Sequence, residues 1–407
     1  MKGAQIPMKL KAKQLSLLMM ITYMVSYFTR INYGAVLVEM VADTGFAKTE
    51  LSMAITGSFI TYGVGQVISG WLGDRISPKH LMAGGLAVTA CINAVLPFFT
   101  TPYAMAGVWC VNGFAQALMW PPLVRIMVAV FNEEEYKHAS VTVSYGSSGG
   151  TILIYLIAPI MVSLLSWKGI FWLASLLAVL IIPVWLYFCP NVAVQRKVPR
   201  AETSTAPTGS IRVLFTPLML ACMVAIVLQG SLRDGVTTWM PTYISETYQL
   251  GSAISILTGV ALPLFSILCF RVTEYIYVNH IRSPLTCAAV VFGVGTLAAA
   301  VLMLVTGRSA VGSIACTAVL TGCMHGVNLI LICMLPHYFK STGRVSLISG
   351  VLNACTYVGS AASTYLIPLI MGNGSWTTTV LLWLLTAAAG TVLCAVCIPA
   401  WKRRFSK

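Results

Sequence analysis

The sequence predicts an all-α membrane protein with twelve spans in two six-helix halves, and three kinds of observation lead to this fold class. Of 407 residues, 58% are hydrophobic and only 9% are charged, whereas a soluble globular protein carries about 25% charged residues. Apolar stretches long enough to cross roughly 30 Å of hydrocarbon recur along the whole chain. A third observation, an internal repeat, divides these stretches into two sets of six.

The expected spans follow from continuous apolar runs bounded by polar or charged segments. They cover residues 15–41, 50–72, 81–99, 103–131, 139–164, 167–188, 216–245, 251–272, 284–306, 310–338, 344–371 and 376–400. A polar stretch rich in Ser, Thr and Pro lies between the sixth and seventh spans and is typical of a flexible linker. We therefore expect an N-terminal bundle (1–188), a cytoplasmic linker (189–215) and a C-terminal bundle (216–407).

The net charge of +14 reflects membrane topology and does not indicate nucleic-acid binding. Lys and Arg gather before the first span, after the last span and in alternate loops, as the positive-inside rule requires of cytoplasmic segments. This pattern predicts a multi-pass protein of the plasma (inner) membrane with both termini in the cytoplasm. The twelve cysteines are scattered through apolar segments, where they pack as small hydrophobic residues. No metal site or other cofactor is expected.

The two halves repeat one another. Arg30 precedes Gly57 by 27 residues, and Arg233 precedes Gly259 by 26 residues. The fifth span contains YLIAPIM and the eleventh contains YLIPLIM, each with a proline eight residues before a tryptophan. Parallel repeats related by an axis along the membrane normal occur in transporters. The repeat would place Arg30 and Arg233 at similar depth, facing a central cavity.

Arg30 and Arg233 lie in the middle of apolar spans, where an arginine costs roughly 2.5–3.5 kcal/mol on insertion scales. An intramembrane charge of this kind indicates a functional site. A guanidinium is a fixed fork of donors that binds carboxylate or phosphate bidentately. The alternative for Arg233 is an ion pair with Asp234, but adjacent residues of a helix point about 100° apart, so we expect Asp234 to turn toward another helix. The two arginines would then attract an oxyanion.

Tyr23 and Tyr27 share a helix face with Arg30, because the three residues stand at i, i+4 and i+7. This polar stripe predicts the wall of a hydrated cavity. Each tyrosine taken alone could equally pack against neighbouring helices.

Several motifs resemble a known family. The loop GWLGDRISPKHL (Gly70–Leu81) is similar to the major-facilitator signature between spans two and three. The segments YMVSYFTRINY (Tyr23–Tyr33), NGFAQALMWPPLVRIMVAVF (Asn112–Phe131) and LRDGVTTWMPTYISE (Leu232–Glu246) resemble signatures of the organophosphate:phosphate antiporters, the glycerol-3-phosphate and hexose-6-phosphate carriers. The resemblance implies the major facilitator fold, with twelve transmembrane helices in two pseudo-symmetric halves.

The resemblance also implies roles for individual residues. Arg30 and Arg233 match the two arginines that grip phosphate in the family. Tyr23, Tyr27, Trp120 and Tyr357 match positions that line the pocket. Asp74 and Arg75 match the acid and base that latch cytoplasmic helix ends, so we expect them to gate transport, whereas Arg125 is expected to be structural.

The sequence departs from the family pattern at four positions. A lysine that assists phosphate binding is replaced by Gln66, and a histidine is replaced by Gly146. Gly259 stands where an acid is expected, and a tenth-span aromatic position falls at His325, with Asn328 one turn further on. We expect Gln66, His325 and Asn328 to contact substrate. For His325 the alternatives are capping a backbone carbonyl, packing, or carrying a proton.

Together these observations predict a secondary active transporter of a small organic anion, an organophosphate or a similar compound. Exchange with inorganic phosphate by alternating access is favoured, because an empty cavity with two unpaired guanidinium groups resists closure. The alternatives are a proton-coupled symporter of a carboxylate, phosphonate or sulfonate, and a transporter-like sensor that binds ligand without flux. The sequence has no motif of a membrane enzyme. Expected partners are the substrate, the counter-anion phosphate and the lipid bilayer, with no nucleic acid and a monomeric chain.

Overall fold

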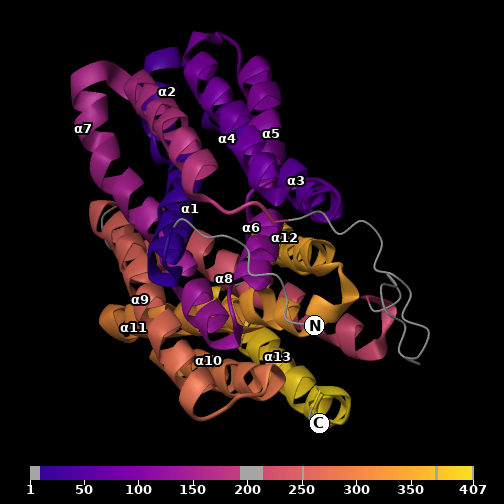
Figure 1. The fold of residues 1–407 in the computed structure, drawn as a ribbon. Coiled ribbons are helices and arrows are strands. Elements are labelled where there is room, and N and C mark those ends of the chain that lie inside the picture. The colour runs from indigo at the N-terminus through magenta and orange to yellow at the C-terminus, as the bar shows by residue number, and fades with distance from the viewer. Residues whose placement is uncertain (1–9, 193–213, 250–251, 372–374, 406–407) are drawn as a thin grey trace. The chain divides into compact units, whose positions relative to one another are not determined.

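The computed structural model describes residues 10–192, 214–249, 252–371 and 375–405, and these residues are almost entirely helical (Figure 1). They fall into two compact units. The first comprises Met1–Gly209 and Phe339–Val351, and the second comprises Ser210–Tyr338 and Leu352–Lys407. Most of the predicted linker, residues 193–213, lies outside the described part of the chain.

The helices of the first unit follow the predicted spans in order. They are α1 (Ala12–Ala35), α2 (Leu37–Thr44), α3 (Lys48–Gly73), α4 (Pro78–Val95), the short 3₁₀ helix η1 (Leu96–Phe98), α5 (Pro102–Ala117), α6 (Trp120–Val130) and α7 (Glu133–Phe188). The predicted fifth and sixth spans are parts of α7, which bends sharply at Leu165 and Ser166, where φ of Ser166 is 60°. Helix α7 begins with a reciprocal cap, in which Asn132 Oδ1 accepts from the Glu135 N–H at 2.9 Å.

The helices of the second unit also follow the predicted spans. They are α8 (Pro217–Tyr248), α9 (Ser252–Asn279), α10 (Pro284–Val305), α11 (Ala310–Asn328), the π-helical turn η3 (Leu329–Met334), the 3₁₀ helix η4 (Leu335–Thr342), α12 (Val345–Met371) and α13 (Trp376–Phe405). The boundary between the two units passes through η4 and α12, since residues 339–351 group with the first unit.

Nine helical segments in the described ranges are long and apolar enough to cross a membrane. They are Pro78–Phe98, Pro102–Val130, Glu133–Ala158, Ile160–Phe188, Pro217–Met240, Pro284–Val305, Ala310–Thr342, Val345–Ser363 and Trp376–Phe405. The predicted all-α membrane fold is confirmed. Helix α1 is as long as these segments, but Arg30 and Asn32 lie within it.

Each unit contains the same carboxylate–indole hydrogen bond. Trp167 Nε1 donates to Asp43 Oδ2 at 2.8 Å in the first unit, and Trp376 Nε1 donates to Glu246 Oε2 at 2.8 Å in the second. Asp43 follows Arg30 by 13 residues, and Glu246 follows Arg233 by 13 residues. The internal repeat is therefore visible in side-chain contacts as well as in sequence.

Small residues allow the helices to pack closely where the arginines lie. Helix α7 meets α1 at Gly146 and Gly150, where an added Cβ would lie 2.5 Å from Met20 O and 2.7 Å from Met24 O, respectively. In the second unit, Gly230 of α8 and Gly359 of α12 make equally close backbone contacts. Helices in a membrane associate mainly by such packing, because lipid supplies no hydrophobic driving force between them.

Adding one methyl group at Gly150 tests this packing. We expect Gly150→Ala to destabilise the first unit by about 1–3 kcal/mol, because the new Cβ would also lie 2.8 Å from Tyr27 Cβ. The matched control is Gly84→Ala in α4, where no atom lies within 4 Å of the added Cβ. Thermal unfolding of the purified variants measures both effects. An equal melting temperature for Gly150→Ala and the wild-type protein would contradict the tight α1–α7 contact.

Candidate functional site

Three aromatic residues and Arg30 form a continuous strip in the first unit. The Tyr23 and Tyr27 rings lie 5.1 Å apart between centroids, and the Tyr23 and Trp120 rings lie 5.2 Å apart. The Arg30 guanidinium carbon lies 5.4 Å from the Tyr27 ring centroid. The sequence predicts five substrate-binding residues in the first half. The structure brings four of them together in this strip and leaves out Gln66.

Arg30 also contacts two rings from α3 that the sequence analysis did not identify. Its guanidinium carbon lies 4.0 Å from the Tyr62 ring centroid and 5.8 Å from that of Phe59. Ring faces attract a cation without neutralising its charge. Phe59 and Tyr62 stand three residues apart on one helix face, which is a signal that the sequence did offer.

A buried amide network holds α1 immediately beside Arg30. Asn112 Nδ2 donates to Thr29 O at 3.2 Å, and Gln116 Nε2 donates to Thr29 Oγ1 at 2.8 Å. From α4, Asn93 Nδ2 donates to Thr89 O at 2.9 Å and to Thr29 O at 3.4 Å. Each of these side chains is at most 2% exposed. Hydrogen bonds from buried amides fix helix register, so these contacts to Thr29 help to set the depth and rotation of Arg30.

The predicted fourth span is broken where Trp120 enters the strip. Helix α5 ends at Ala117, and α6 begins at Trp120, followed directly by Pro121 and Pro122. Proline has no N–H and cannot continue the hydrogen-bond ladder of a preceding helix, but it fits the first turn of a new one. Discontinuous membrane helices are common at transporter binding sites.

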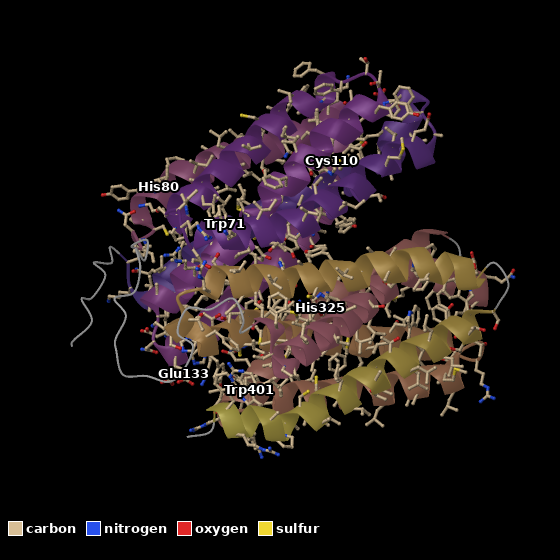
Figure 2. The ribbon with its side chains drawn as sticks, turned by 90° about the vertical axis from the view of Figure 1, so that its right-hand side faces the viewer. Trp71, His80, Cys110, Glu133, His325 and Trp401 are labelled. Atoms are coloured by element: carbon tan, nitrogen blue, oxygen red, sulfur yellow. The ribbon has the colours of Figure 1, made fainter. Side chains whose placement is uncertain are left out.

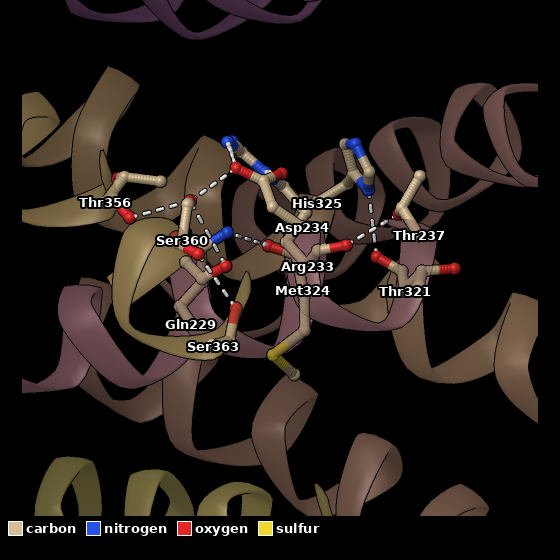
Figure 3. A network of polar contacts seen from close by, with 11 residues as sticks. Gln229, Arg233, Asp234, Thr237, Thr321, Met324, His325, Thr356, Ser360 and Ser363 are labelled. Carbon is tan, nitrogen blue, oxygen red and sulfur yellow. Dashed lines mark hydrogen bonds and ion pairs between the residues drawn. The ribbon is translucent and has the colours of Figure 1, made fainter. Parts of the chain in front are cut away.

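In the second unit, Arg233 is paired with Asp234, contrary to the expectation from sequence (Figure 3). Arg233 Nε donates to Asp234 Oδ1 at 2.7 Å, and Nη2 donates to Oδ2 at 2.9 Å. The backbone directions of adjacent residues do diverge, but the long arginine side chain folds back far enough to close both bonds. The expectation that Asp234 turns away from Arg233 is therefore wrong.

Asp234 also reaches a second helix, as the sequence analysis expected. Ser360 Oγ of α12 donates to Asp234 Oδ2 at 2.5 Å and also lies 2.9 Å from Thr356 O. Tyr357, the predicted pocket residue of α12, lies in the same helical turn as Ser360 and is partly buried. Ser360 was not predicted, because a serine in an apolar span carries no distinctive signal.

His325 lies on α11 within electrostatic range of Arg233 and Asp234 (Figures 2 and 3). Its Nδ1 is 2.9 Å from the Thr321 carbonyl oxygen, and its ring meets Phe270 edge-on at 5.8 Å. This contact with a backbone carbonyl agrees with the alternative that His325 caps a carbonyl group. Asn328 is the last residue of α11 and is partly buried, directly before the π-helical turn η3. Such turns are frequent at functional sites.

Two of the departures from the family pattern have clear structural settings. Gln66 is fully buried, and its Nε2 donates to Ala117 O at 3.4 Å, at the end of α5. No larger side chain fits at Gly146, because its Cβ would meet the α1 backbone. Gly259 lies in a stretch of α9 whose side chains are outside the described part of the chain.

The predicted gating residues separate in the structure. Asp74 accepts hydrogen bonds from the backbone N–H groups of Ser346 and Leu347, at 3.1 and 3.0 Å, and thereby caps the start of α12. Arg75 instead lies over the Trp71 ring, with its guanidinium carbon 4.0 Å from the ring centroid. Arg125 donates to the Gly73 carbonyl beside Asp74.

Comparison with known proteins gives one family match and several distant relatives. A family model described as Major Facilitator Superfamily matches residues 19–335. A probable hexose phosphate transport protein of Chlamydia muridarum is 27% identical over 158 residues, which cover 39% of this chain and 35% of that protein. The glycerol-3-phosphate transporter of Bacillus subtilis is 26% identical over 243 residues, 54% of each chain.

A third relative carries a different role in its name. The membrane sensor protein UhpC of Salmonella typhimurium is 25% identical over 244 residues, 55% of each chain. The matched region thus spans from about one third to about half the length of these relatives. The resemblance to the organophosphate:phosphate antiporter family that the motifs predict is confirmed by these matches.

The contact between Asp74 and α12 predicts a pH-dependent stability. Burial raises the pKa of the Asp74 carboxyl from 3.8 to about 6, although the two backbone N–H bonds and Arg125 act in the opposite direction. Folding is therefore more favourable when Asp74 is protonated than when it is ionised. The resulting contribution to the free energy of unfolding, on the order of 3 kcal/mol, is complete below pH 4 and is lost as the pH rises through 6.

Melting temperatures of the wild-type protein and Asp74→Asn between pH 4 and 8 measure this contribution. The amide resembles the protonated acid and does not titrate, so the two proteins should melt alike below pH 4, and the wild type should melt lower above pH 6. A constant difference across this range would contradict the assignment.

Proposed function

Because the chain belongs to the Major Facilitator Superfamily, it is a multi-pass membrane transporter and not an enzyme; we propose that it carries a small organic anion, an organophosphate or a similar compound, in exchange for inorganic phosphate. The relatives named for hexose phosphate and glycerol-3-phosphate transport support this substrate class. The observation that carries the proposal is the setting of two arginines within apolar helices at repeat-related positions.

One anion would be bound by Arg30 of the first unit and Arg233 of the second. Arg30 lies at one end of the strip formed with Tyr23, Tyr27 and Trp120. The tyrosine hydroxyls and the tryptophan N–H of this strip are hydrogen-bond donors beside the guanidinium. Arg233 binds the Asp234 carboxylate through two hydrogen bonds, the geometry in which a guanidinium also binds a separate oxyanion, and this supports its assignment. We assign Gln66, His325, Asn328 and Tyr357 to the surroundings of this site.

Exchange follows from the electrostatics of the empty carrier. Closing a cavity around two guanidinium groups removes water from their charges, and this desolvation is costly unless an anion is enclosed with them. Either the organic anion or phosphate brings negative charge into the closing site, so the loaded carrier closes and reorients more readily than the empty one. In this alternating-access cycle Asp74 would hold the start of α12 against α3 in one conformation, and Arg125 would hold the α3 end that carries Asp74.

Two other functions remain alternatives with specific support. A proton-coupled symporter needs a carboxylate inside the membrane, and Asp234 provides one within a predicted span. A ligand sensor is supported by the similarity to the membrane sensor protein UhpC. For each function we propose a monomer in the plasma (inner) membrane with both termini in the cytoplasm, following the distribution of basic residues.

Transport into proteoliposomes tests the exchange. Vesicles loaded with inorganic phosphate should take up labelled phosphate or glycerol 3-phosphate at least roughly tenfold faster than vesicles loaded with chloride, because only a bound anion allows the carrier to return. Equal uptake without internal phosphate would rule out exchange. Uptake driven by an imposed proton gradient would indicate symport, and binding without flux would indicate a sensor.

A further inference from the structure

The Asp234 carboxylate is hydrogen-bonded to the Arg233 guanidinium in the same geometry that a bound anion would adopt. The two carboxylate oxygens accept from Nε and Nη2 at 2.7 and 2.9 Å (Figure 3). This two-donor edge is the one by which a guanidinium binds phosphate or carboxylate in parallel hydrogen bonds. The Arg233 side chain is 14% exposed and that of Asp234 is 32% exposed, so the pair is only partly screened by solvent.

The pair is held from more than one helix. Ser360 of α12 donates to Asp234 Oδ2 at 2.5 Å, and His325 of α11 lies within electrostatic range of both charged groups. If Asp234 were displaced from Arg233, its carboxylate would keep the Ser360 hydroxyl as a donor. The structure thus offers Asp234 a partner with and without the arginine.

An arriving anion must therefore share Arg233 with Asp234 or displace it. A carboxylate that displaces Asp234 replaces one carboxylate by another, so it gains little at Arg233 and loses the advantage of a partner already attached to the chain. A phosphate dianion brings more charge and more acceptor oxygens, which can serve two guanidinium groups at once. The competition thus favours multiply charged oxyanions.

We propose that Asp234 is an internal counter-anion that competes with the transported anion for Arg233 and thereby selects phosphate-type dianions over monocarboxylates. This inference rests on the proposed function, since it names the substrate class of the same site. It also gives the ion pair a role in the transport cycle: in the absence of substrate, Asp234 neutralises one of the two arginines.

Binding of inorganic phosphate and of acetate to the purified full-length protein at pH 7.5 tests the proposal by calorimetry. We expect Asp234→Asn to bind phosphate roughly tenfold more tightly than the wild type, because the competing charge is removed. Acetate affinity should rise by a larger factor, so the preference for phosphate over acetate should fall. Ser360→Ala removes the donor that a displaced Asp234 would keep, so it should weaken the binding of both anions by a smaller factor.

The matched control is Glu246→Gln, which removes another acid from α8 that accepts a hydrogen bond from a side chain, Trp376. It should leave both affinities unchanged. Wild-type binding of phosphate with equal or weaker binding by Asp234→Asn would overturn the inference and leave the proposed function intact. If Asp234→Asn does not fold, an unchanged phosphate affinity and an unchanged preference in Ser360→Ala would overturn it. Absence of phosphate binding in the wild type would instead overturn the proposed function, and the inference with it.

Discussion

The constraint on which the structure depends is the cost of holding two guanidinium groups within apolar helices. Each unit meets this cost in a different way. Arg30 lies among ring faces from α1 and α3, which stabilise a cation. Arg233 is paired with Asp234, which cancels the charge. Two repeat-related arginines thus have different surroundings, with aromatic rings in one unit and a carboxylate in the other.

The surrounding scaffold serves to place these side chains. Gly146 and Gly150 bring α7 against α1, and the amides of Asn93, Asn112 and Gln116 fix α1 from the other side. The break before Trp120 lets a new helix start with its indole against Tyr23. Because each contact acts on the backbone of α1 or on the rings beside Arg30, changes well removed from the guanidinium would still alter its position.

Much of this could be predicted from the sequence, because apolar periods and charge placement are properties of whole segments. The helices and the strip of Tyr23, Tyr27 and Arg30 followed from them. The choice between a paired and an unpaired Arg233 could not be made from the sequence, since it depends on the conformation of one long side chain and not on helix direction. Likewise, the role of Gln66 depends on which helix lies opposite, and Arg75 separates from Asp74 because it packs on Trp71. Periodicity determines none of these.

The central claim is that one anion is bound by both arginines, and a double-mutant cycle tests it most directly. Phosphate affinity is measured for the wild type, Arg30→Lys, Arg233→Lys and the double variant, with lysine keeping the charge but losing the bidentate fork. If both residues grip the same anion, each single variant loses most of the affinity, and the double variant loses little more, with a coupling energy of at least about 1 kcal/mol. Strictly additive losses, or wild-type affinity in either single variant, would contradict the shared site.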